Sequence, residues 1–175
     1  AVRTLNKNKC RKKTTILAPS VNYKTQAIEA AYVAVCHTDL EPDIRDLPGF
    51  VPVSQYGSRQ TICPQEFGSV ENVRFITTTI ATPFADAGGL DGDAVLSTTG
   101  TNADVYPVLI FGEDAYGTVA LKGKDSAEIL VRNPGKPENG NELGQRGSVG
   151  WKGWHVAARL NEAWMVRLEV AATLL

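Results

Sequence analysis

The sequence has few of the residue patterns that mark catalytic or metal-binding proteins. Its only histidines are His37 and His155. Its three cysteines, at positions 10, 36 and 63, form no CxxC pair and no His/Cys ligand spacing. They are odd in number and widely spaced, which favours reduced thiols in an intracellular product over a disulfide framework. No GxGxxG follows an expected strand, and no Walker motif or Gly-x-Ser-x-Gly elbow is present. We therefore expect no cofactor and no metal.

Long apolar runs and an excess of one charge are also missing. No apolar run approaches the roughly 18 to 20 residues of a membrane span, and no basic segment precedes an apolar one as in a secretory signal. The net charge of −1 gives no overall attraction to nucleic acid or to a membrane surface. With 175 residues, of which 43% are hydrophobic, the chain is long enough for one domain with an ordinary core.

Residues 85–104 are mostly Ala, Gly, Asp, Ser and Thr, which predicts a long surface loop. Asp91 and Asp93 raise a calcium hypothesis, but the glycine and the distal glutamate of an EF-hand loop are absent from their positions. The glycines of this loop are not followed by Gly-Lys-Ser/Thr, so they make no phosphate-binding loop. We expect a functional or mobile loop without a metal.

The stretch from Ala31 to Arg74 is the centre of the chain. Residues 32–36 form an uncharged run of small, β-branched and aromatic side chains, which predicts a strand buried on both faces. A short helix should follow, capped by Thr38 or Asp39, with Glu41 at capping-box spacing from Thr38. A proline–glycine pair ends it. The pattern indicates a buried strand feeding a short, acid-capped helix in a mixed α/β domain.

The other segments supply further elements of this domain. Residues 1–13 resemble the last turns of a helix, residues 25–30 favour a helical turn, and residues 51–57 fit a short helix or a loop equally well. Proline at position 107 indicates an edge strand or a bulge. The strands expected from β-branched and aromatic residues cover residues 73–80, 105–112, 118–121 and 127–132.

The C-terminal segment alternates in polarity. Apolar side chains from Trp164 to Val170 share one face, with Arg167 and Glu169 on the other. This predicts two strands with a bend near residues 161–162. A helix over residues 156–167 is the alternative, because Ala, Arg, Leu, Glu and Met all favour it.

Several side chains raise specific functional hypotheses. His37 lies between a strand and a helix start, where catalytic bases often lie, so a small intracellular hydrolase using His37 with Cys36 or an Asp is one hypothesis. A structural histidine is favoured, and a hydrogen-bonded or interface role is expected for His155. The tryptophans at 151, 154 and 164 fit a core or a subunit interface better than a ligand cage. Residues 3–24 are basic, which raises a nucleic-acid-binding hypothesis, but they include no aromatic pattern for base stacking.

An ordered set of motifs resembles one known family. From about residue 30 to residue 175, the chain resembles the major capsid proteins of a tailed-bacteriophage family. The motifs that resemble the family are Tyr32-Val33-Ala34-Val35-Cys36-His37, Asp43-Ile44-Arg45, Gln55-Tyr56-Gly57, Glu66-Phe67-Gly68-Ser69-Val70, Asn72-Val73-Arg74-Phe75-Ile76, Asp104-Val105-Tyr106-Pro107, Phe111-Gly112-Glu113-Asp114-Ala115-Tyr116-Gly117, Gln145-Arg146-Gly147-Ser148-Val149-Gly150-Trp151-Lys152 and Trp164-Met165-Val166-Arg167-Leu168-Glu169.

The resemblance implies the Hong Kong 97 phage-type capsid fold, an α+β fold with an axial and a peripheral domain. Residues 1–30 would be the end of the spine helix and its connection, residues 31–150 the axial domain, and residues 151–175 the returning peripheral strands. The family's N-terminal arm, extended loop and most of the spine helix have no counterpart here. The family often has proline where this chain has Thr38. The chain is thus expected to be the C-terminal part of a capsid protein.

The resemblance also implies a function. The chain would be a structural subunit, not an enzyme, that assembles with copies of itself into pentamers and hexamers of an icosahedral phage head enclosing DNA. It would be made in the bacterial host cytoplasm and end in the virion. Further partners would be scaffold, portal or cement proteins and, non-specifically, packaged DNA, with no membrane. A bacterial nanocompartment shell of the same fold is the alternative within this class.

This function requires broad subunit contacts with charged rims. Asp43, Arg45 and Arg74 are expected to hold subunits or loops together, and no residue is expected to act in catalysis or to bind a cofactor or metal. The arginines proposed for the rims are Arg45, Arg59, Arg74, Arg146 and Arg167.

Overall fold

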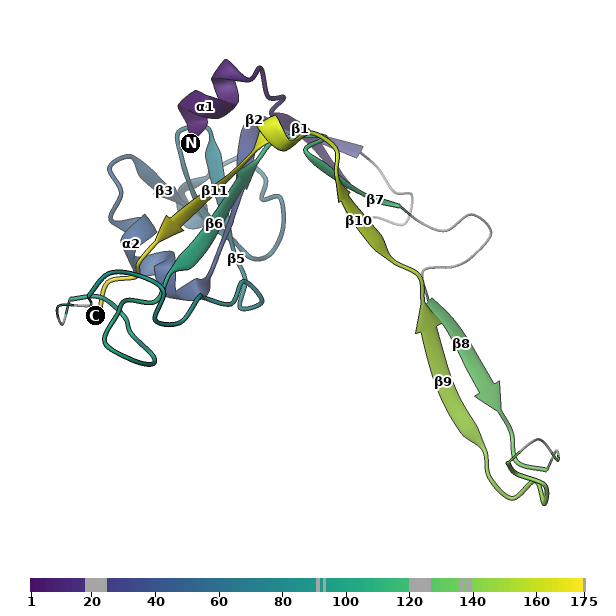
Figure 1. Cartoon of the computed structure of the whole chain (residues 1–175). Helices are drawn as coiled ribbons and strands as arrows, with labels where there is room; N and C mark the ends of the chain where they lie inside the picture. Colours follow the sequence, from purple (N-terminus) through teal and green to yellow (C-terminus); the bar gives the residue numbers. More distant parts are fainter. Residues whose placement is uncertain are drawn as a thin grey trace. The chain divides into compact units, whose positions relative to one another are not determined.

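Strands dominate the structure, a computed structural model that describes residues 1–17, 25–90, 92, 94–119, 127–135, 137 and 140–174. The chain forms two compact units: unit 1 comprises Ala1–Ala115 and Asn161–Leu175, and unit 2 comprises Tyr116–Leu160. The helices of the described part are short (Figure 1).

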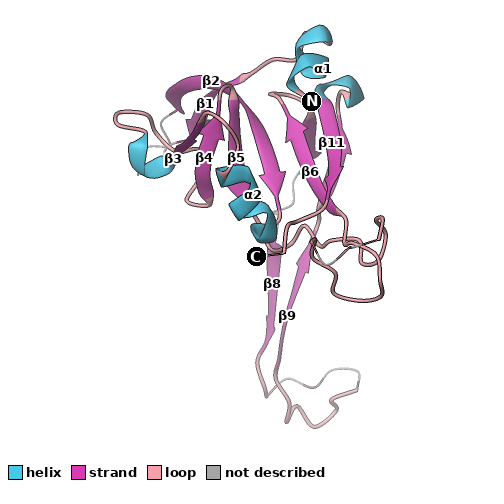
Figure 2. Cartoon of the chain, turned by 90° about the vertical axis from the view of Figure 1, so that its left-hand side faces the viewer, coloured by secondary structure: helices cyan, strands magenta, loops and turns pink. Residues whose placement is uncertain are grey.

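The core of unit 1 is a mixed seven-stranded sheet with the order β11-β6-β2-β5-β4-β3, in which β1 also pairs with β2 (Figure 2). Strands β2 and β5 run parallel, and the other pairs are antiparallel. The strands are β1 (Lys13–Leu17), β2 (Thr25–Cys36), β3 (Phe50–Pro52), β4 (Glu66–Val70), β5 (Val73–Thr77), β6 (Tyr106–Phe111) and β11 (Met165–Val170).

The second half of β2 is the centre of this sheet. It lies between β5 and β6, with Ala34 opposite Phe75 on one side and Ile110 on the other. Tyr32, Val33 and Ala34 are all buried although neighbouring side chains point to opposite faces. The prediction of a strand buried on both faces is confirmed.

The first half of β2 differs from the prediction. Residues 25–30, expected to form a helical turn, continue the strand and pair with β1, with Thr15 opposite Ala27 and Ile16 opposite Gln26. The alanines of this segment favour a helix locally. Hydrogen bonding along β1 outweighs that weak preference, as tertiary context commonly does.

The short helix after β2 is present, but a different residue caps it. A 3-10 turn, η1 (Thr38–Leu40), leads directly into α2 (Glu41–Arg45). Nδ1 of His37 accepts a hydrogen bond from the backbone N–H of Asp39 at 3.2 Å. The predicted cap by Thr38 or Asp39 is therefore wrong by one or two residues, because His37 itself has the extended backbone of a cap.

Two other local predictions are resolved. The helix expected within residues 1–13 is α1 (Val2–Lys7), which buries Leu5 completely. The ambiguous residues 51–57 contain the end of β3 and a second 3-10 turn, η2 (Val53–Gln55).

Pro107 lies in β6, which is an inner strand of the sheet. Strand β2 covers β6 only from Leu109 to Phe111, so on that side it does not reach Pro107. On the other side Pro107 faces Glu169 of β11. The residue thus sits where β6 has one strand neighbour, which explains how a proline fits this inner strand.

The loop of residues 85–104 is irregular where it is described, and a buried carboxylate organises it. Asp104 is fully buried and accepts hydrogen bonds from Asp86 N–H at 3.0 Å, Thr98 N–H at 2.9 Å and the Thr98 hydroxyl at 2.7 Å. The Thr98 hydroxyl, followed by the Asp86 N–H, lowers the pKa of the Asp104 carboxyl. Asp91 and Asp93, on which the calcium hypothesis depends, lie outside the described residues.

The described part of unit 2 contains two antiparallel strand pairs. Strand β7 (Tyr116–Val119) pairs with β10 (Val156–Arg159), and β8 (Ala127–Arg132) pairs with β9 (Ser148–Gly153). The alternative helix over residues 156–167 does not form, because β10 is followed by a 3-10 turn, η3 (Glu162–Trp164), and then by β11. The two predicted strands with a bend near residue 161 are confirmed.

The chain is therefore a mostly-β protein with a mixed seven-stranded sheet and a short helix. The α+β class was predicted. The predicted strands are extensive, but the helices of the described residues amount to a few turns. The expected division at residue 30 falls inside β2. The three-part division into peripheral, axial and returning segments stays a prediction.

Candidate assembly surfaces

His37 is held as a structural residue. Its ring centroid lies 5.4 Å from that of Tyr106, and its side chain is only 14% exposed. Its Nδ1 atom lies 3.1 Å from Oδ2 of Asp39, which also accepts a hydrogen bond from the Tyr106 hydroxyl at 2.9 Å. The histidine thereby ties the start of η1 to strand β6.

Cys36 does not fit the role of a nucleophile beside His37. Its thiol is fully buried and donates to the Ile76 carbonyl at 3.6 Å. Burial raises the pKa of the Cys36 thiol to about 12, so the reactive thiolate is scarce near neutral pH. Within the described residues, no group of three or more His, Cys, Asp or Glu side chains could hold a metal ion.

Arg74 does not supply a charged rim, and the prediction that it does is wrong. Its side chain is 2% exposed, and Nη1 donates to the Gln60 carbonyl at 2.6 Å and lies 3.7 Å from Oε1 of Glu66. Glu66 is also buried and accepts hydrogen bonds from the Tyr56 hydroxyl at 2.8 Å and from Ile62 N–H at 2.6 Å. The pair instead holds the loop between η2 and β4, which is the loop-holding role expected as the alternative.

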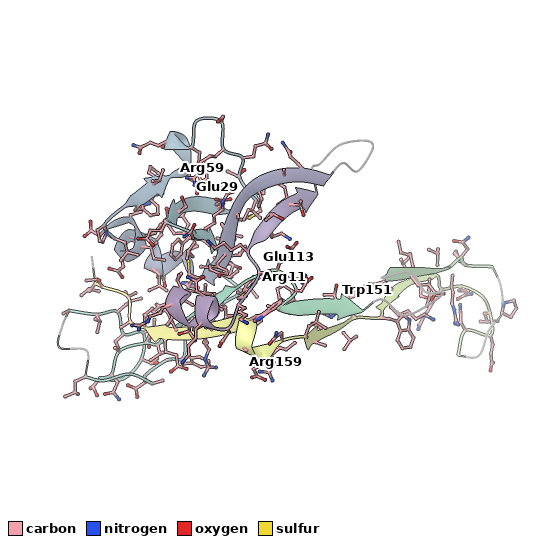
Figure 3. The ribbon with its side chains drawn as sticks, turned by 90° about the horizontal axis from the view of Figure 1, so that it is seen from above. Arg11, Glu29, Arg59, Glu113, Trp151 and Arg159 are labelled. Carbon is pink, nitrogen blue, oxygen red and sulfur yellow. The ribbon has the colours of Figure 1, made fainter. Side chains whose placement is uncertain are left out.

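The other arginines of unit 1 beyond the N-terminal segment are paired at the surface. Arg45 lies 2.6 Å from Glu41, and Arg167 lies 2.7 Å from Glu169. Arg59 forms an ion pair with Glu29, and the two side chains point toward one another in Figure 3. Such exposed pairs contribute only about 0–1 kcal/mol each to stability. Arg146, in unit 2, is exposed.

Some of the basic N-terminal residues contact the protein itself. Arg11 lies 4.0 Å from Asp114, and the Lys12 ammonium lies 5.7 Å from the ring centroid of Tyr32. These contacts are an alternative to a nucleic-acid role for at least these two side chains.

The three tryptophans are divided between the two units. Trp164, in unit 1, is half-buried against the core, and its Nε1 donates to the Asn8 carbonyl at 3.1 Å. Trp151 and Trp154, in unit 2, are 77% and 48% exposed. The core role is confirmed for Trp164 alone.

The β8–β9 ribbon has an apolar face that was not expected from the sequence. The register places Ile129 opposite Trp151 and Val131 opposite Val149, and directly paired residues share a face. We call these four side chains the apolar face of the ribbon. Their exposures are 72%, 77%, 59% and 77%, in the order given. Trp151 projects from the ribbon in Figure 3.

The opposite face of the ribbon is more polar. The Lys152 ammonium lies 3.1 Å from Glu128, and Arg132 is paired in register with Ser148. This face also contains Leu130, which is paired with Gly150 and is 47% exposed, so the ribbon has one apolar face and one mixed face. Burying one large apolar side chain is worth about 1.5–3 kcal/mol, so covering this face would be favourable.

The apolar run of residues 129–131 and the alternation of Val149, Gly150 and Trp151 are the signals that could have revealed the apolar face. The pairing could not have been read from them, because the connection between the two strands leaves the register open.

Together these features define a mostly-β protein whose second unit exposes an apolar sheet face. No protein-family model and no curated protein matches the chain. No helix in the described part of the chain is long and apolar enough to cross a membrane.

Proposed function

We propose that the chain is part of a structural shell protein, the major capsid protein of a tailed phage, with the Hong Kong 97 phage-type fold. Copies of it would assemble into pentamers and hexamers of an icosahedral head that encloses DNA. The protein would be made in the bacterial host cytoplasm and reside in the virion. Its main partners would be further copies of itself, joined in the head by scaffold, portal or cement proteins.

The observation that supports this proposal most is the exposed apolar face of the β8–β9 ribbon. Exposed apolar surface of this kind marks interaction sites in soluble proteins. A two-stranded ribbon is also marginal on its own in water. Residues 145–152, which contain most of β9, are one of the motifs that resemble the capsid family. Strand β9 thus contains both part of the exposed apolar face and most of a motif that resembles capsid proteins.

The environments of Cys36 and His37 favour this proposal over the hydrolase. The cysteine is a buried thiol and the histidine caps a helix, so both have structural partners. A His37→Ala variant tests the rival directly. The hydrolase hypothesis requires a turnover that this variant loses, whereas a shell protein has none to lose.

Electron microscopy and light scattering of the purified protein test the proposal. We expect rings of five or six copies, with a mass five or six times that of the 18.8 kDa chain, or closed particles. A species of 18.8 kDa at every concentration would contradict it. For closed particles formed in cells, enclosed DNA indicates a phage head, whereas an enzyme cargo indicates the nanocompartment alternative.

A further inference from the structure

The apolar face of the ribbon is not covered by the described residues of unit 2. Its four side chains, Ile129, Trp151, Val131 and Val149, are each more than half exposed. The other face is mixed, with the Glu128–Lys152 ion pair and a single large apolar side chain, Leu130. A ribbon of this kind is stabilised when its apolar face packs on another protein surface about 10 Å away.

The distribution of charge between the two units indicates which protein surface the apolar face packs on. Residues 116–160, which form unit 2, contain seven Lys or Arg and four Asp or Glu, a net charge of +3. The residues of unit 1 contain eleven Lys or Arg and fifteen Asp or Glu, a net charge of −4. The two units thus have charges of opposite sign.

The acidic surplus of unit 1 is not neutralised by its own arginines. Outside residues 1–24, unit 1 has fifteen acidic residues and four arginines. Each of these arginines already lies within 4.0 Å of a glutamate of the same copy. Acidic side chains such as Asp46, Glu71 and Asp86 are exposed at its surface. A basic partner is therefore attracted to unit 1.

We propose that the apolar face of the ribbon docks on unit 1 of a second copy of this chain. The contact is head-to-tail: unit 2 of one copy meets unit 1 of the next. Pairing of two ribbons would instead bring together two copies of unit 2, each with a net charge of +3, which is unfavourable. The inference rests on the proposed function, which supplies many copies side by side, and it names the surfaces that join them.

A head-to-tail contact has a consequence for symmetry. Because its two surfaces differ, it repeats from copy to copy and forms a ring where the rotation between copies closes. Like-with-like pairing of ribbons would stop at a dimer. The inferred contact is thus of the kind that capsomer rings need.

Photo-cross-linking tests which surfaces meet. In the full chain, Val149 is replaced by the photoreactive residue p-benzoylphenylalanine, and ¹⁴N- and ¹⁵N-labelled proteins are mixed before irradiation. We expect mixed-isotope products that join position 149 to peptides of unit 1. The matched control places the same group at Leu130, on the opposite face of the ribbon, where we expect several times less product.

Three results would overturn the inference. They are products that join position 149 to residues 127–153 of another copy, products formed within one copy only, and the absence of any product specific to position 149.

A second variant measures the strength of the contact. Trp151→Ser should weaken self-association by roughly 10- to 100-fold, because a central aromatic side chain is lost from the interface. Leu130→Ser, on the opposite face, should change it less than about threefold. Sedimentation velocity gives both association constants. Equal effects of the two substitutions would contradict the inference.

The outcome separates the inference from the proposed function. Rings or particles whose cross-links map elsewhere would overturn the docking surface and leave the shell protein standing. Cross-links from position 149 to unit 1 of another copy, without rings or particles in electron micrographs, would support the docking surface and count against the shell. A chain that stays monomeric contradicts both.

Discussion

Isoleucine occurs at position 110 in unit 1 and at position 129 in unit 2, and the two side chains differ in how deeply they are buried. Ile110 lies in β6 between two other strands and is 4% exposed. Ile129 lies in a two-stranded ribbon and is 72% exposed. Unit 1 therefore has a core of its own, whereas the ribbon of unit 2 has an apolar face that the described residues of that unit leave exposed. The two isoleucines thus differ in burial, and substitutions at the two positions test what each side chain stabilises.

The largest effect is expected from the buried ion pair of unit 1. Arg74→Met leaves Glu66 buried without its cation and should lower the free energy of unfolding by about 3–5 kcal/mol. Urea unfolding measures the loss. Adding Glu66→Gln to this variant should restore part of the stability, because the uncompensated charge is removed. A loss below about 1 kcal/mol for the single variant would mean that the pair does not hold the loop.

The two isoleucines give the most closely matched comparison. Ile110→Ala should cost about 2–5 kcal/mol of unfolding free energy, because it leaves a cavity in the core. Ile129→Ala, measured in dilute protein, should stay within about 0.5 kcal/mol of the parent. Similar losses for both would show that the ribbon is packed within its own copy, and the contrast between the units would fail.

A third prediction concerns the loop that Asp104 organises. Hydrogen bonds lower the pKa of this carboxyl in the folded protein, so its contribution to stability is present above the ordinary aspartate value of about 3.9 and is lost as the pH falls through the lower folded value. Asp104→Asn should therefore be less stable than the parent at neutral pH, and the two should converge in acid. Unfolding curves from pH 7 downward measure this. A constant difference at all pH values would exclude the carboxylate as the cause.

The smallest effect is expected in the ribbon itself. Lys152→Ala removes an exposed cross-strand ion pair with Glu128 and should weaken the β8–β9 pairing by at most about 1 kcal/mol. Amide hydrogen exchange of residues 127–132 and 148–153 reports it, while β2 should exchange as in the parent. Faster exchange of β2 would mean that the ribbon also stabilises unit 1.

The sequence predicts the parts of the fold that depend on local pattern. The apolar run at residues 32–36 indicates the central strand, and the acidic residues after it indicate the short helix. It fails where distant pairing decides the outcome. Residues 25–30 have helix-favouring alanines but pair with β1, and His37 caps η1 because of its extended backbone.

The candidate surface was not predicted from the sequence, for the same reason. From the sequence, Arg74 is expected at the surface. The fold buries it beside Glu66 and the Gln60 carbonyl. The apolar face of the ribbon requires the register that puts Ile129 opposite Trp151, and that register is a property of the paired strands. Each strand alone contributes only two of the four side chains of this face.

Amide hydrogen exchange at two protein concentrations tests the central claim most directly. It compares the covered core of unit 1 with the ribbon in one experiment. We predict that residues 127–132 and 148–153 exchange faster in dilute protein and gain protection in concentrated protein, while residues 32–36 are protected in both. Exchange of the ribbon that is unchanged by concentration would contradict the account, because its apolar face would then have no partner among copies of this chain.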